Sequence, residues 1–140
     1  MNIIIDSNEL FSALIKDSVT RKIILDYNRF FFFPSFIFEE VQEHKKELLK
    51  KSGMSEEDFN ELFQLILKKV VIVPNEVLVP YKKEAFEIVK SIDPDDVLFV
   101  ACALAYTNSI LWSNDRKLKK QSRVEVFNTE EIIKLLQIRS

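Results

Sequence analysis

Four acidic residues lie near the ends of predicted strands or the starts of predicted helices, and they are the residues here best suited to chemistry. They are Asp6, Glu40, Asp96 and Asp115. Carboxylates gathered within a few ångströms repel one another, so such a group needs a cation. Hard oxygen ligands select Mg²⁺ or Mn²⁺. With Gly53 as the one glycine, Gly-rich phosphate loops are excluded. The pattern therefore favours metal-assisted hydrolysis of a phosphate ester.

The chain offers very few nitrogen and sulfur ligands. His44 is its one histidine and Cys102 its one cysteine, so we do not expect a zinc site. A single cysteine also forms no disulfide framework, which favours a reducing compartment such as the cytoplasm. Cys102 lies in an apolar segment, and we expect a core thiol rather than a reactive one.

Each acidic residue also has a simpler interpretation. Asp6 could cap the first helix, and Asp96, like the acids beside it, suits a helix N-terminus, where the macrodipole favours negative charge. Glu40 could be solvated charge on a helix face, and Asn114 with Asp115 could form a turn or cap. Each signal is weak alone, but four acids at one sheet edge are harder to explain by capping.

The first strand sets the position of Asp6. Ile3, Ile4 and Ile5 form an unbroken β-branched run, which is typical of a central parallel strand buried on both faces. Asp6 follows directly, and helical spacing begins over residues 9–15. In open α/β sheets, ligands bind where the chain leaves the carboxyl ends of the strands. We therefore expect the other acids to gather around Asp6.

Strands and helices are predicted to alternate along the rest of the chain. Apolar runs predict strands over residues 29–34, 70–74, 109–112 and 124–127, and helical spacing or capping signals predict helices over 20–27, 35–51, 55–68, 81–91, 97–106 and 128–138. Gly53 is expected to end a helix as a C-cap, and Asp93 to be an N-cap. Phe38 is expected on the inner side of its helix.

This alternation predicts a parallel sheet between helical layers. The length of 140 residues fits one domain covering residues 1–140. The net charge of −2 argues against a uniformly basic nucleic-acid coat but leaves room for local basic patches. We expect no membrane association, because no secretion signal is visible and the longest apolar run, residues 97–106, is too short to span a bilayer.

Four segments of the chain resemble the conserved blocks of PIN-domain nucleases. They are Ile3-Ile4-Ile5-Asp6-Ser7-Asn8, Phe38-Glu39-Glu40-Val41, Asp96-Val97-Leu98-Phe99-Val100-Ala101-Cys102-Ala103-Leu104 and Leu111-Trp112-Ser113-Asn114-Asp115. The resemblance covers essentially the whole chain, in the family's order. It implies a three-layer α/β/α sandwich with a central parallel sheet of four to five strands, and cleavage of single-stranded or structured RNA with Mg²⁺ or Mn²⁺.

The resemblance also assigns roles to individual residues. Asp6 matches the first acidic ligand, Glu40 the second, Asp96 the third and Asp115 the fourth. Ser7 and Asn8 match the small polar positions after the first ligand, Ser113 matches the hydroxyl position before the last, and Asn114 lies between them.

Two registers stay open, and one position departs from the family. Glu39 and Glu43 are alternatives to Glu40, and Asp95 is the alternative to Asp96. Toxin members of the family often carry another acidic residue shortly after the fourth block. Lys117 stands there, so the number of metal ions stays open.

RNA binding requires positive charge around an acidic site. One basic group lies on the predicted helical hairpin and another follows Asp115 directly, which makes the second the stronger candidate. The first comprises Lys45, Lys46, Lys50 and Lys51, and the second Arg116, Lys117, Lys119, Lys120 and Arg123. The first group is equally well explained as solvated helix charge.

The resemblance implies partners as well as a substrate. Many members of the family are toxins held by a small antitoxin and assembled as dimers, so both an antitoxin and a homodimer are expected. Two other functions remain open. One is a catalytically degenerate PIN-like or flavodoxin-like module that binds RNA or protein. The other is a phospho-accepting receiver, although its third predicted strand ends in Pro74 and Asn75 rather than an aspartate.

Overall fold

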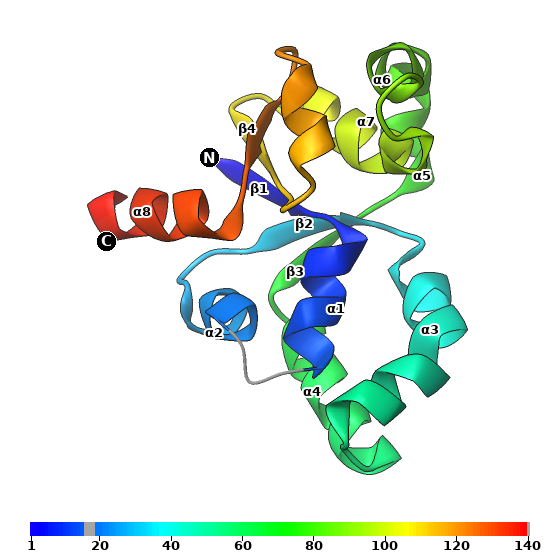
Figure 1. Ribbon diagram of the computed structural model, residues 1–140, viewed down its shortest axis with the longest axis vertical. Helices are drawn as coiled ribbons and strands as arrows, with labels where there is room; N and C mark the ends of the chain where they lie inside the picture. The colour runs from blue at the N-terminus through cyan, green and yellow to red at the C-terminus, as the bar shows by residue number, and fades with distance from the viewer. Residues whose placement is uncertain (16–18, 140) are drawn as a thin grey trace.

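The computed structural model describes residues 1–15 and 19–139 and contains a five-stranded sheet between helices (Figure 1). Every strand pair is parallel, and the strand order is β3-β2-β1-β4-β5. The strands are β1 (Asn2–Ile5), β2 (Phe31–Pro34), β3 (Val70–Val73), β4 (Ser109–Trp112) and β5 (Glu125–Phe127). The predicted parallel sheet of four to five strands is confirmed.

Helices cover both faces of this sheet. α1 to α4 lie on one side, and α5 to α7 on the other (Figure 1). The α-helices are α1 (Ser7–Ile15), α2 (Val19–Asp26), α3 (Ile37–Ser52), α4 (Glu56–Leu67), α5 (Asn75–Leu78), α6 (Lys82–Val89), α7 (Val97–Ala105) and α8 (Thr129–Arg139). The 3-10 turns are η1 (Val79–Tyr81), η2 (Pro94–Asp96) and η3 (Arg116–Lys120). The three-layer α/β/α sandwich is confirmed.

β1 is the central strand. Ile3 lies opposite Phe31 of β2 and Ile110 of β4, and Ile4 and Ile5 are completely buried. The chain runs from β1 to β2 and from β4 to β5. Because β2 and β5 lie on opposite flanks of the β1–β4 pair, these two connections lead towards opposite edges of the sheet. The carboxyl ends of β1 and β4 therefore form a topological switch point, where open α/β sheets bind their ligands.

The helical hairpin of α3 and α4 confirms the capping signals and corrects one packing prediction. Gly53 ends α3 in the left-handed conformation with φ 68°, and Ser55 caps α4 by accepting from the Asp58 backbone N–H. Phe38 is not on the inner side: it is 49% exposed, with its ring 6.3 Å from that of Phe63. The buried stripe of α3 runs instead through Ile37, Val41 and Leu48, and Phe38 lies one position beside it.

The apolar segment predicted over residues 97–106 is the internal helix α7. Its residues 99–103 are buried between the sheet and α6. Cys102 is a free, buried thiol, and burial raises its pKa to about 12, so the predicted core thiol is confirmed. Among the described helices, none combines the length and apolar character that a bilayer crossing needs.

Candidate active site

Asp6 lies at the carboxyl end of β1, where the chain turns into α1. Its side chain is 4% exposed, and its Oδ1 accepts from the backbone N–H of Glu9 at 2.9 Å. Its own N–H donates to the carbonyl of Trp112 at 3.3 Å, which joins the ends of β1 and β4. Asp6 therefore caps α1, as the simpler interpretation expected, and also lies at the switch point.

Ser113 connects Asp6 to Asp115. Its side chain is buried just after β4 and forms a hydrogen bond with the Asp6 carboxylate. The backbone N–H of Asp115 donates to Ser113 Oγ at 3.1 Å. The Asp115 carboxylate accepts from the N–H of Lys117 at 3.0 Å and so caps η3. The buried Ser113 hydroxyl is therefore hydrogen bonded both to the Asp6 side chain and to the Asp115 backbone.

Asp96 comes from the turn before α7 and completes an acidic cluster. One carboxylate oxygen from each of Asp93, Asp96 and Asp115 lies within 4.8 Å of the other two. Asp93 caps η2 by accepting from the N–H of Asp95 at 3.2 Å. Asp95 is exposed and lines the same cleft as Asp6 and Asp96. The acidic cluster, Asp6, Asp93, Asp96 and Asp115, therefore draws on three separate segments.

Sequence reasoning assigned Asp93 only a capping role. The structure confirms the cap but also brings its carboxylate to Asp96 and Asp115. The signal that could have revealed it is the Asp-Pro-Asp-Asp run over residues 93–96, which places several acids in one tight turn.

Burial and repulsion from neighbouring carboxylates raise the pKa of two aspartates of the acidic cluster, Asp96 and Asp6. Burial raises the pKa of Asp96 to about 7, and Asp93, then Asp6, then Asp115 add to the shift. Burial also raises the pKa of Asp6, opposed by the Ser113 hydrogen bond and strengthened by Asp115.

No lysine or arginine in the described ranges forms an ion pair with these aspartates. Within the described residues, the carboxylates of the acidic cluster are therefore not neutralised by an ion pair. Its donor set of carboxylate and hydroxyl oxygens fits a hard divalent cation such as Mg²⁺ or Mn²⁺.

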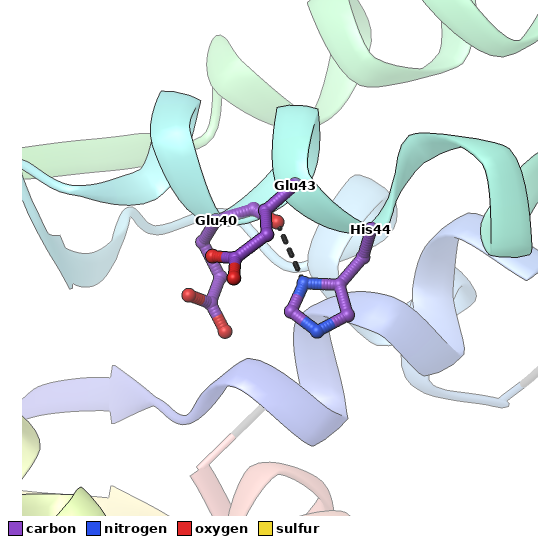
Figure 2. Close-up of side chains that lie close together, drawn as sticks. All are labelled: Glu40, Glu43 and His44. Atoms are coloured by element: carbon purple, nitrogen blue, oxygen red, sulfur yellow. Dashed lines mark hydrogen bonds between the residues drawn. The ribbon is translucent and has the colours of Figure 1, made fainter.

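Glu40 lies in the same cleft but belongs to a different group of side chains. One ligand atom each from Glu40, Glu43 and His44 lies within 4.8 Å of the others, and all three project from α3 towards α1 (Figure 2). The His44 Nδ1 lies 2.9 Å from the Glu40 carbonyl oxygen, and its ring packs against Phe11 at 4.9 Å. The structure thus brings Glu40 to the cleft without joining it to the aspartates.

The cleft lined by Glu40, Glu43 and His44 and by three of the clustered aspartates, Asp6, Asp93 and Asp96, has a volume of about 510 Å³. Its walls include Asp6 and Asp96 from the sheet edge, Glu40 from α3, and Ser7 and Asn8 from the first turn of α1. The predicted small polar positions after Asp6 therefore face the cleft. It is large enough to admit a phosphate group and part of a nucleotide beside the acids.

Glu9 is a buried acid that sequence reasoning missed. It is 3% exposed, and burial raises its pKa to about 7, with a further contribution from Asp6. An acid in the first turn of a helix normally complements the macrodipole in solvent, so its position alone gives no warning. Glu9 and Ala13 are four residues apart, and both face the core, which is the signal that could have revealed it.

The predicted basic residues fall into paired and unpaired sets. Arg116 and Lys119 line a second pocket, of about 300 Å³, together with Ser113 and Asp115. Lys45, Lys51, Lys119 and Arg123 are engaged in ion pairs with Glu56, Glu47, Glu131 and Glu84 respectively. In the described part of the chain, Lys46, Lys50, Arg116, Lys117 and Lys120 form no ion pair. Arg116 is therefore the unpaired cation that adjoins Asp115.

Comparison with known proteins gives one match. A family model described as PIN domain matches residues 4–136, which spans β1 through most of α8 and includes the whole acidic cluster. No curated protein sequence and no solved structure matches the chain.

Proposed function

This chain belongs to the PIN-domain family, whose members are generally nucleases, and from that premise we propose that it is a metal-dependent endoribonuclease. The observation that carries the proposal is the meeting of Asp93, Asp96 and Asp115 beside the buried Asp6 at the switch point of the sheet. Such a concentration of unpaired carboxylates is costly unless a cation shares it.

The proposed ligands are Asp6, Asp96 and Asp115, with Glu40 approaching from α3. When bound, Mg²⁺ or Mn²⁺ activates a water molecule and neutralises the charge that develops on the phosphate. Ser113 holds Asp6 and the backbone of Asp115 in one arrangement. We propose Asp96 rather than Asp95 as the third acidic ligand, because an oxygen of Asp96 lies close to those of Asp93 and Asp115 whereas Asp95 is exposed.

RNA is the proposed substrate. Arg116 adjoins Asp115, and Lys117 and Lys120 follow on η3 without ion pairs in the described ranges, so phosphates can be held close to the acidic cluster. Lys119 lines the same pocket as Arg116 and is paired with Glu131. Lys45 and Lys46 on α3 form the second proposed contact, of which Lys45 is paired with Glu56.

The proposal extends to setting and assembly. A cytoplasmic protein that forms a homodimer and is restrained by a small antitoxin is the form most consistent with the family resemblance. A receiver is not supported, because the strand order 3-2-1-4-5 differs from the flavodoxin-like order 2-1-3-4-5. A degenerate PIN module that binds RNA without cutting it is the remaining alternative.

The experiment that tests the proposal is cleavage of a labelled single-stranded RNA with Mn²⁺. We expect Asp6→Asn and Asp96→Asn each to lose roughly 100-fold or more of the wild-type rate, since each removes a charged ligand. Asp58→Asn is the matched control, because Asp58 is an exposed acid in the first turn of α4, and it should cut like wild type.

Two results would contradict parts of this proposal. Full activity in both Asp6→Asn and Asp96→Asn would show that the metal ligands are wrong. A wild-type protein that binds RNA and Mn²⁺ without cutting would favour the degenerate module.

A further inference from the structure

We propose that Glu9 is a positioning residue that holds the segment carrying Ser113 and Asp115 in place through Asn114. The inference rests on the proposed metal site and adds a residue that contacts neither metal nor substrate. It is carried by a hydrogen-bond network around the buried Glu9 carboxylate that joins α1, the end of β4 and the start of α8.

Both carboxylate oxygens of Glu9 accept hydrogen bonds from distant parts of the chain. Oε1 accepts from Asn114 Nδ2 at 2.8 Å, and Oε2 accepts from the Thr129 hydroxyl at 3.1 Å. The partners are 105 and 120 residues away in the chain. Burying a carboxylate is costly unless it is hydrogen bonded, and these two bonds supply what solvent would otherwise provide.

Thr129 completes the network from the other side. Its hydroxyl accepts from Trp112 Nε1 at 3.0 Å, and Asn114 Nδ2 lies 3.1 Å from it. Its backbone N–H donates to Asn114 Oδ1 at 2.9 Å. Both ends of the Asn114 amide are therefore held, the nitrogen by Glu9 and the oxygen by the first residue of α8.

Asn114 lies between the two residues that organise the acidic cluster. Ser113 bonds to Asp6, and the N–H of Asp115 donates to Ser113 Oγ. If the Asn114 side chain lost these partners, the backbone on both sides of it would be free to shift, and the Asp115 carboxylate would move relative to Asp6. The Glu9 backbone N–H also donates to Asp6 Oδ1, so Glu9 contacts the first acidic segment and orients the last.

An apolar residue at position 9 would pack there without this cost. The neighbouring core positions Leu10, Ala13 and Leu14 are apolar. A carboxylate here instead specifies a single orientation of the Asn114 amide, because the acceptor pairs with the NH₂ and not with the carbonyl. Groups that orient metal ligands in this way typically change metal affinity by about 10–100-fold when they are removed.

The test exchanges donor and acceptor between positions 9 and 114. Glu9→Gln places an amide opposite the Asn114 amide and the Thr129 hydroxyl, which both donate to a carboxylate in wild type. Glu9→Gln combined with Asn114→Asp again places a donor opposite an acceptor and keeps the total charge of wild type. The measurement is the Mn²⁺ dissociation constant from paramagnetic resonance of free Mn²⁺, with thermal unfolding recorded in parallel. Asn114→Asp alone reports the effect of its added charge.

We expect Glu9→Gln to raise the Mn²⁺ dissociation constant about tenfold, and the exchanged pair to return it to within about threefold of wild type. Glu57→Gln, an exposed acid on α4, is the matched control and should bind like wild type. Thr129→Val keeps the shape of the side chain but loses the hydroxyl, so it should weaken Mn²⁺ binding. It replaces Glu9→Gln in the test if that variant does not fold. Thr129→Ser, which keeps the hydroxyl, should restore Mn²⁺ binding.

The outcomes separate this inference from the proposed function. Weaker Mn²⁺ binding in Glu9→Gln and recovery in the exchanged pair support it, even in a protein that cuts no RNA. Lower thermal stability with unchanged Mn²⁺ affinity would make Glu9 purely structural and overturn the inference alone, as would an exchanged pair no better than Glu9→Gln. A wild-type protein that binds no Mn²⁺ would overturn both.

Discussion

A carboxylate oxygen of Asp96 lies within 4.8 Å of one from Asp115, although the two residues come from opposite sides of α7 in the sequence. Asp96 precedes that helix, and Asp115 follows the strand after it. Burial, then repulsion from Asp93 and Asp6, and then the nearby Asp115 raise the pKa of Asp96 to about 7. Near neutral pH, a cation and a proton therefore compete for the same site.

The first prediction concerns the stability of the metal-free protein. Because the pKa of Asp96 is raised in the folded state, its protonated form is favoured there, and the stability it contributes is complete below the ordinary pKa of an aspartate. That contribution is lost as the pH rises through the folded pKa of about 7. We expect the midpoint of thermal unfolding in EDTA to fall by several degrees, on the order of 5 °C, between pH 5 and pH 8.

The matched variant for this prediction is Asp96→Asn, which removes the titrating group and should flatten the pH dependence. Glu9 contributes in the same direction, since its pKa is also about 7, so some dependence should remain. Mn²⁺ should restore wild-type stability at pH 8 more than at pH 5. Stability that rises with pH in EDTA would contradict the assignment of a raised pKa to Asp96.

The second prediction separates the two groups of ligand atoms, one from Asp93, Asp96 and Asp115 and the other from Glu40, Glu43 and His44. If the ion is held by the aspartates with help from Glu40, Glu40→Gln should weaken Mn²⁺ binding several-fold, because an amide oxygen carries no charge. His44→Gln should leave Mn²⁺ affinity within about twofold, since a hard ion prefers oxygen ligands. Titration calorimetry on both variants measures this.

The opposite result for Glu40→Gln and His44→Gln would place the ion at the other group of ligand atoms. A loss of Mn²⁺ affinity in His44→Gln as large as in Asp96→Asn would place the ion between Glu40, Glu43 and His44. Thermal unfolding of His44→Gln checks its fold, because His44 also contacts Phe11 and the Glu40 carbonyl.

The third prediction concerns the charge beside Asp115. Arg116→Ala should raise the KM for single-stranded RNA several-fold and reduce the slope of log affinity against log salt by about 0.7, as expected for one lost phosphate contact. Arg123→Ala is the matched control. Arg123 lines a pocket with Asn108 and Ser109 at the amino end of β4, which is the opposite edge of the sheet.

Binding measured over a range of salt concentrations distinguishes the two arginine variants. Arg123→Ala loses the ion pair with Glu84 but should keep the wild-type slope. Equal slopes for Arg116→Ala and wild type would remove Arg116 from the RNA surface.

The sheet and the strand-end acids could be predicted because their signals are local. The isoleucine run of β1 and the immediate arrival of Asp6 are visible within eight residues, and the same is true of Ser109–Trp112 and Asp115. Because these short strands are buried on both faces, their apolar composition is enough to predict them, and no alternation of apolar and polar residues is needed.

The side chains that could not be predicted are those whose partners are distant. Glu9 resembles a solvated first-turn acid until Asn114 and Thr129 are placed beside it. Glu40 lies on α3 and lines the cleft, but the rotation and position of α3 decide whether it meets the aspartates or Glu43 and His44. These relations depend on packing between layers, which spacing along one helix does not encode.

The central place of β1 has a consequence for the order in which the protein is made. Ile3 pairs with Phe31 on one side but with Ile110 on the other, so the ribosome releases β1 long before its second neighbour. Until β4 emerges, β1 presents an open edge that other chains can join. Asp115 is also synthesised long after Asp6, so a stalled or truncated translation product that lacks Asp115 cannot assemble the proposed site. Such a product would not cleave the messenger RNA that encodes it.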